Sequence, residues 1–169
     1  MNKTKNKHQP ESKSHDTIGE QHNGISESQI LAWAESILEA RFKRSNYITS
    51  PSHTREYLSV TLADKEREVF CMIYLDSQHG IIDFEILFHG TIDAASVYPR
   101  EVVKSALKYN AAAIILAHNH PSGSPEPSSA DKRITDQIIT ALKTVDIRVL
   151  DHLIVGGTQS ISFAELGLL

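Results

Sequence analysis

Residues 111–131, AAAIILAHNHPSGSPEPSSAD, join an aliphatic run, two histidines and a Pro/Gly/Ser-rich loop. The run 111–117 predicts a buried strand that ends near His118. Alternate residues of a strand point to the same side, so we expect His118 and His120 to present their imidazoles together. The loop then reverses the chain, and SSAD opens a helix that would bring Asp131 back to the end of the strand.

Two histidines and a carboxylate, with one position left open, are typical ligands of a catalytic zinc ion. Imidazoles suit zinc better than magnesium or calcium, which prefer oxygen ligands. The H-x-H pair alone is weak evidence, because nine histidines among 169 residues produce one by chance roughly half the time. Ser128 and Asp131 also fit the helix-capping pattern S-x-x-D, which needs no metal. The two roles are compatible, because a cap fixes where the first helical turn presents its carboxylate.

The flanking sequence predicts an α/β fold, a layered mixed β-sheet with helices packed against it. Residues 67–76 and 81–90 are strand-like and separated by a short turn, which predicts a hairpin. Helices are expected over 98–110 and 129–143, followed by a strand over 147–155 and a closing hairpin. A capping pattern at Ser26, and Pro51 after Ser50, predict two earlier helices.

The composition divides the chain into three parts. Residues 1–24 are polar and predict a disordered tail. Residues 25–49 are expected to form a helix and a linker, and residues 50–169 the folded domain. In the first helix, Ile30, Ala34, Ile37 and Leu38 follow helical spacing, with Trp33 beside them, and predict one apolar face.

Several classes of protein are disfavoured. The net charge of −4 argues against strong non-specific nucleic-acid binding, although a local basic patch would still allow some. A single cysteine, Cys71, rules out an intrachain disulfide and a thiolate-rich zinc site, and its apolar neighbours predict a core position. Without a signal-like segment or a run of roughly 20 apolar residues, we expect a cytoplasmic protein with no membrane partner.

The segment HNHPSGSPEPSSAD resembles the JAMM motif of the JAB/MPN metalloprotease superfamily: His-x-His, seven residues, Ser, two residues, Asp. More narrowly, YPREVVKSALKYNAAAIILAHNHPSG and DHLIVGG resemble the bacterial RadC family, over about residues 30–169. The resemblance implies the JAB/MPN fold, which has a cytidine-deaminase-like architecture. Longer RadC-type proteins carry a helix-hairpin-helix region that the first 50 residues here do not resemble, and this weakens a DNA-binding interpretation.

The resemblance also implies roles for individual residues. His118, His120 and Asp131 match the positions that hold Zn²⁺, with a water molecule as the remaining ligand. Ser128 matches the serine that stabilises the oxyanion. His152 matches a family position as well, and we expect it to be a hydrogen-bonded histidine in the core or beside a ligand rather than a fourth ligand.

The superfamily's general base is an upstream glutamate, and here the sequence leaves alternatives. Glu68 stands at the start of the strand after the first helix and is our choice, with Glu85 on the partner strand as its rival. Glu66 and Glu101 are weaker candidates. For Asn119, between the two histidines, we expect hydrogen bonds to the backbone of the loop.

These features predict a zinc-dependent hydrolase that cleaves a peptide or isopeptide amide bond in a peptide or protein substrate of unknown identity. The alternative is a non-catalytic DNA repair or recombination accessory with a structural metal, a role that the RadC name carries. An HNH nuclease is disfavoured because its motif is dispersed over a ββα unit. A zinc deaminase would need H-x-E and P-C-x-x-C, which one cysteine cannot provide.

Overall fold

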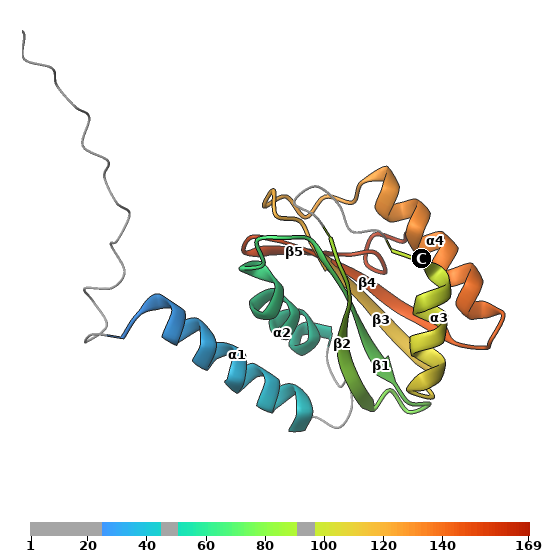
Figure 1. Ribbon diagram of the computed structural model, residues 1–169, viewed down its shortest axis with the longest axis horizontal. Coiled ribbons are helices and arrows are strands. Elements are labelled where there is room, and N and C mark those ends of the chain that lie inside the picture. The colour runs from blue at the N-terminus through green and yellow to red at the C-terminus, as the bar shows by residue number, and fades with distance from the viewer. Residues whose placement is uncertain (1–24, 45–50, 91–96) are drawn as a thin grey trace, which may run out of the picture.

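The computed structural model describes residues 25–44, 51–90 and 97–169 (Figure 1). The predicted disordered tail, residues 1–24, lies outside this part of the chain. In chain order, the elements are α1 (Glu27–Arg44), α2 (Pro51–Ala63), β1 (Val69–Leu75), β2 (Ile81–His89), α3 (Pro99–Lys108), β3 (Ala113–Asn119), α4 (Ser129–Lys143), β4 (Arg148–Gly156) and β5 (Gln159–Ser162).

The five strands form one mixed sheet in the order β2-β1-β3-β4-β5. β3 and β4 are parallel, and the other neighbouring pairs are antiparallel. The α/β fold class is therefore confirmed, as are the β1–β2 hairpin and the closing hairpin of β4 and β5. The predicted bounds of the helix 129–143 agree with those of α4.

β1 and β3 lie inside the sheet, and all of their residues are buried. Strands covered on both faces have continuous apolar sequences rather than alternating ones, which explains VFCMIYL and AIILAHN. Cys71 has no exposed surface, as predicted for a core residue. Burial raises the pKa of its thiol to about 12.

Helices cover both faces of the sheet (Figure 1). On one face, Leu58 and Leu62 of α2 pack with Cys71 and Ile73 of β1. On the other, α3 and α4 pack against alternate residues of the same strand, such as Met72 and Tyr74. This second face also carries the side chains discussed below.

Helix α1 packs against α2 and extends away from the sheet (Figure 1). Ala34 and Leu38, which are four residues apart, are half-buried. Trp33 is 57% exposed and Ile37 53% exposed. Ile37 belongs to the predicted apolar face and is nevertheless exposed, because contact with one neighbouring helix covers only a narrow stripe of α1.

Helix α4 connects the parallel strands β3 and β4, so both strands end at the same edge of the sheet. Ligands of α/β proteins bind outside the carboxyl ends of parallel strands, where loops and helix termini meet. His118 and Asn119 lie at this end of β3, and the first turn of α4 returns to it. No helix within the described ranges is long and apolar enough to span a bilayer.

Candidate metal centre

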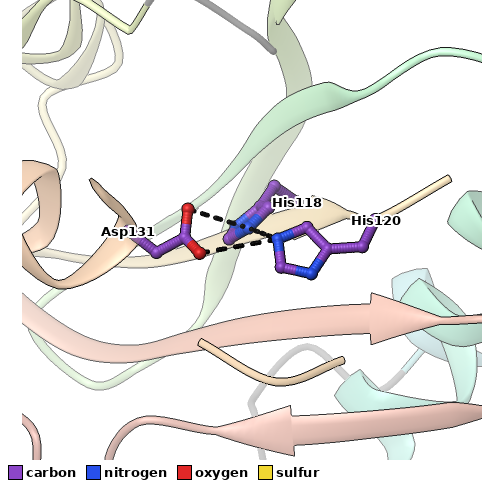
Figure 2. A group of neighbouring side chains, drawn as sticks. All are labelled: His118, His120 and Asp131. Atoms are coloured by element: carbon purple, nitrogen blue, oxygen red, sulfur yellow. Dashed lines mark hydrogen bonds and ion pairs between the residues drawn. The ribbon is translucent and has the colours of Figure 1, made fainter. Parts of the chain in front are cut away.

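The side chains of His118, His120 and Asp131 converge at the carboxyl end of β3 (Figure 2). The Nε2 atoms of the two histidines are 3.0 Å apart. Asp131 Oδ1 lies 3.5 Å from His118 Nε2, and Asp131 Oδ2 lies 3.5 Å from His120 Nε2. The folded chain thus brings together the three residues expected to bind zinc, which are called the His/Asp cluster below.

The spacing of the His/Asp cluster fits a metal ion. Tetrahedral zinc with bonds of about 2.0–2.1 Å has ligand atoms about 3.3 Å apart. The observed separations of 3.0 Å and 3.5 Å lie on either side of this value, although the two 3.5 Å distances end on different oxygens of Asp131. One ligand atom from each residue lies within 4.8 Å of the other two, so a tetrahedral ion could take these three ligands after the side chains close around it.

His120 is oriented by the loop that follows it. Its Nδ1 atom lies 2.8 Å from the carbonyl oxygen of Ser124. A carbonyl only accepts hydrogen bonds, so Nδ1 carries a hydrogen and donates it. In the neutral ring Nε2 then has a free lone pair, which faces the other members of the cluster. This is the arrangement that a metal-binding histidine needs.

A second histidine, His152, contacts the His118 ring on the side away from the cluster. His118 is 1% exposed, and its Nδ1 lies 2.8 Å from Nε2 of the fully buried His152. His152 is therefore a buried hydrogen-bonded neighbour of the cluster, as predicted. Burial lowers the pKa of His118 to about 4 and that of His152 well below its usual value. Both rings are neutral near pH 7, and the neutral imidazole is the form that binds metals.

Asp131 is fixed by the capping box that the sequence predicts. Ser128 Oγ accepts a hydrogen bond of 3.1 Å from the Asp131 amide, and the Ser128 amide donates one of 2.7 Å to Asp131 Oδ2. Burial would raise the pKa of Asp131, but the hydrogen bonds from His120 and Ser128 outweigh this effect and hold it below its usual value. The cap and the ligand position are thus compatible, because capping aims the charged carboxylate at both imidazoles.

Comparison with known proteins identifies the family. The family model described as the RadC-like JAB domain matches residues 48–168. The chain belongs to the RadC-like JAB domain family. Curated relatives include the UPF0758 proteins of Vibrio campbellii, 54% identical over 153 residues, and Vibrio cholerae, 55% identical over 152. These alignments cover 87% and 86% of this chain and 68% of each relative. The UPF0758 protein of Vibrio atlanticus is 56% identical over 138 residues, which is 82% of this chain and 62% of the relative.

The resemblance to the RadC family is therefore confirmed, and the His/Asp cluster lies within the matched RadC-like JAB region. The names of these relatives assign no activity. The chemistry must therefore be argued from the remaining residues of the site.

Ser128 is exposed at the start of α4 in the RadC-like JAB domain. Its Oγ atom accepts the capping bond from the Asp131 amide. A hydroxyl that accepts one hydrogen bond can still donate its own hydrogen. The cap therefore leaves the expected oxyanion role chemically open, and that role stays a prediction.

Glu68 immediately precedes β1 and is half-buried. The hydrogen bond to Asp131 raises the pKa of His120, against the effect of burial, and the negative charge of Glu68 acts in the same direction. The Glu68 carbonyl accepts a 2.7 Å bond from the Gly90 amide, which ties this segment to the end of β2. Glu68 is thus within electrostatic range of the cluster, as a candidate base should be.

Asn119 anchors the segment that carries Glu68. Its Oδ1 accepts a 2.8 Å bond from the Val69 amide. Its Nδ2 donates bonds of 3.2 Å to the carbonyls of Lys65 and Arg67. We expected Asn119 to bond the loop that follows it, but these bonds go to the segment before β1. The sequence could not reveal these partners of Asn119, because the bonds depend on the pairing of β1 with β3.

Glu85 lies elsewhere on the same face of the sheet. Its Oε2 accepts hydrogen bonds from Tyr74 Oη at 2.7 Å and from Ser105 Oγ at 2.8 Å. Glu85 pairs with Met72 of β1, which pairs with Leu116 of β3, so Glu85 lies two strands across the sheet from β3, which corresponds to about 10 Å. Of the two rivals, Glu68 is therefore the one near the cluster. Glu66 is exposed, and Glu101 pairs with Lys104 on α3.

Gly156 contributes to the geometry of the His/Asp cluster, and the sequence interpretation missed it. A Cβ atom on Gly156 would lie 2.5 Å from the backbone nitrogen of Pro125 and 2.6 Å from the carbonyl carbon of Ser124. The absence of a side chain therefore lets the loop lie against the end of β4. Since the Ser124 carbonyl orients His120, Gly156 supports the cluster indirectly. The pair GG at 156–157 was the available signal, but it predicts a turn equally well.

Proposed function

We propose that this RadC-like JAB domain is a zinc-dependent hydrolase that cleaves an amide bond in a peptide or isopeptide. The observation that carries the proposal is the convergence of two imidazole nitrogens and one carboxylate at separations of 3.0–3.5 Å. A mixed His/Asp set of this spacing suits zinc better than it suits magnesium or calcium.

Access to the cluster supports a catalytic rather than a structural ion. The His118 side chain is 2% exposed, whereas those of His120 and Asp131 are 17% and 13% exposed. The cluster is therefore sealed on the side of the sheet and reachable from the side of the loop. Structural zinc sites have four protein ligands, while catalytic sites have three and an open position.

Under this proposal, other residues of the chain transfer the proton, stabilise the oxyanion and position the base. Zinc bound by the cluster would polarise the substrate carbonyl and lower the pKa of a water molecule to about 7. Glu68 would accept the proton that the attacking water loses and pass it to the departing nitrogen. Ser128 would donate a hydrogen bond to the substrate oxygen as it gains negative charge. Asn119 would hold the segment of Glu68 against the end of β3 through its three backbone bonds.

Metal content tests the site directly. The purified chain should contain about one zinc ion per molecule when measured by elemental analysis, since one cluster provides one ion's ligands. His118→Ala and Asp131→Ala should each reduce this to background. The matched control is His53→Ala, which removes an exposed histidine from α2 and should leave the zinc content unchanged. Full zinc content in both ligand variants would contradict the proposal.

Hydrolysis tests the reaction class. Suitable probes are a fluorogenic peptide library of mixed sequence and a peptide joined to a lysine side chain through an isopeptide bond. Glu68→Gln should keep its zinc and lose a factor of about 10²–10⁴ in rate, the usual contribution of a general base. Glu85→Gln is the matched control and should keep both its zinc and its rate of hydrolysis. No cleavage of either probe by the zinc-loaded protein would count against amide hydrolysis, and an unchanged rate in Glu68→Gln would remove Glu68 from its role.

A further inference from the structure

Behind the His/Asp cluster, a chain of buried hydrogen bonds connects His118 back to Asp131. Thr135 Oγ1 lies 2.6 Å from the carbonyl oxygen of Asp131, one turn earlier in α4, and 2.7 Å from His152 Nδ1. His152 Nε2 lies 2.8 Å from His118 Nδ1. Thr135 and His152 have no exposed surface and His118 has 1%.

The direction of every bond in this chain follows from its last acceptor. The Asp131 carbonyl can only accept, so it takes the single hydroxyl hydrogen of Thr135. Thr135 must then accept from His152, which places a hydrogen on His152 Nδ1. A fully buried imidazole is disfavoured in its charged form, so His152 Nε2 carries a lone pair. It can only accept the hydrogen bond from His118 Nδ1.

We propose that Thr135 and His152 are positioning residues that fix the tautomer of His118. With its hydrogen held on Nδ1, the neutral His118 ring presents the lone pair of Nε2 to the cluster. The chain also closes a ring, because Asp131 supplies the final carbonyl through its backbone and a ligand through its side chain. β3, β4 and α4 are thereby joined at the point where the ligands must meet. The metal-binding part of this inference rests on the proposed function.

Removal of the threonine hydroxyl should release this constraint. Without an acceptor at Nδ1, His152 can move its hydrogen to Nε2 and donate it to His118 Nδ1. The neutral His118 would then carry its own hydrogen on Nε2, the atom that has to bind the ion. A substitution that touches no ligand should therefore weaken zinc binding.

Helix α4 contains a matched control for the threonine. Thr140 Oγ1 donates to the Asp136 carbonyl at 2.8 Å, the same bond to the preceding turn. Thr140 is exposed, and among the described residues its hydroxyl makes no hydrogen bond to a histidine. Thr140→Val removes the same hydroxyl from the same helix. Any loss of zinc affinity that is caused only by placing valine in a helix should appear in both Thr135→Val and Thr140→Val.

The experiment compares zinc affinities of the full chain by competition with a chromophoric chelator. Thr135→Val should weaken binding by a factor of about 10–100, the usual cost of losing a hydrogen-bond partner behind a metal ligand. Thr135→Ser, which restores the hydroxyl, should bind within about threefold of the unchanged protein, and so should Thr140→Val. Equal affinities of Thr135→Val and the unchanged protein would overturn the proposal. A loss in Thr135→Val that Thr135→Ser does not restore would also overturn it.

A second measurement does not depend on the folding of any variant. Nitrogen-15 NMR of the imidazoles in the metal-free, unchanged protein should show His118 and His152 each protonated on Nδ1. Protonation of His152 on Nε2 would overturn the inference. If the unchanged protein bound no zinc, the proposed function would fail while the NMR result still decided the tautomers, so the two failures are distinguishable.

Discussion

Two polar clusters lie on the same face of the sheet, and only one of them is suited to a metal ion. The His/Asp cluster lies at the carboxyl end of β3. The second, called the Tyr74 cluster, consists of Tyr74, Glu85 and Ser105, and its two strand residues lie across β1 and β2, in register with Ile114 and Leu116 of β3. Each contains one carboxylate, and each draws its side chains from more than one element.

The clusters differ in where their hydrogens lie. In the Tyr74 cluster, two hydroxyl groups donate to the carboxylate of Glu85. Burial raises the pKa of Tyr74, so its hydroxyl keeps its hydrogen. In the His/Asp cluster, Nε2 of the neutral His118 directs a lone pair at Nε2 of His120 across 3.0 Å and toward the carboxylate of Asp131. Three acceptors that meet need a proton or a cation between them, whereas in the Tyr74 cluster each of the two hydroxyl groups has a hydrogen to direct at the carboxylate of Glu85 or at the other hydroxyl.

The largest expected difference is in zinc-dependent stability. An ion that binds only the folded state stabilises it by about 4 kcal/mol when free zinc exceeds the dissociation constant a thousandfold. Chemical denaturation with zinc and with a chelator should show this increment in the unchanged protein and in Glu85→Gln. Asp131→Asn keeps the shape of the side chain but removes its charge, and should show no increment. An increment that persists in Asp131→Asn, or disappears in Glu85→Gln, would reverse the assignment of the two clusters.

The Tyr74 cluster should matter to folding without affecting metal binding. Tyr74→Phe removes one donor from Glu85 inside the protein, and we expect a loss of about 1–3 kcal/mol in the free energy of unfolding. Zinc content should be unchanged. Tyr98→Phe, at a tyrosine that is 56% exposed, is the control and should change stability by less than about 0.5 kcal/mol. Loss of zinc from Tyr74→Phe would show that the clusters are coupled.

The sequence predicts the strands of this face well, because burial on both sides of β1 and β3 leaves continuous apolar runs. It also predicts the convergence of the His/Asp cluster, since two histidines on one side of a strand and a capping aspartate after a short loop depend mainly on local geometry. Glu68 could not be separated from Glu85 in this way. The two lie in different rows of the sheet, and the row of each residue depends on strand register, which the sequence does not reveal.

The supporting contacts of the His/Asp cluster were equally hidden from the sequence. Thr135 on α4 meets His152 on β4 because of how the helix lies on the sheet. Asn119 bonds the segment before β1 only because those strands pair. A threonine in a helix and an asparagine beside a loop have common local roles, so neither residue type signals a partner that is distant in the sequence.

Substitution of Gly156 should affect the His/Asp cluster but not the Tyr74 cluster, and the expected effect is smaller than those above. In Gly156→Ala the new methyl group would overlap the backbone of the 123–125 loop, which must then move. Because Ser124 orients His120, zinc affinity should fall by about tenfold, in the range found when the hydrogen-bond partner of a ligand is disturbed. Gly156 has no role in the bonds of the Tyr74 cluster. Unchanged zinc affinity would show that the loop can adjust without moving its Ser124 carbonyl.

Cys71 provides the smallest expected effect and reports on β1, the strand that carries Tyr74 and that contacts His118 through Phe70. It lies on β1 between Phe70, which stacks on His118, and Met72, but it faces α2 on the opposite side of the sheet. With its pKa raised to about 12, only about one thiol in ten thousand is ionised at pH 8. A thiol reagent should therefore label the folded chain very slowly and label one thiol per chain on unfolding. Saturating zinc should slow the labelling of the unchanged protein further, because labelling requires opening of the structure. In Asp131→Asn, zinc should make no difference, and an effect of zinc there would indicate an ion bound outside the His/Asp cluster.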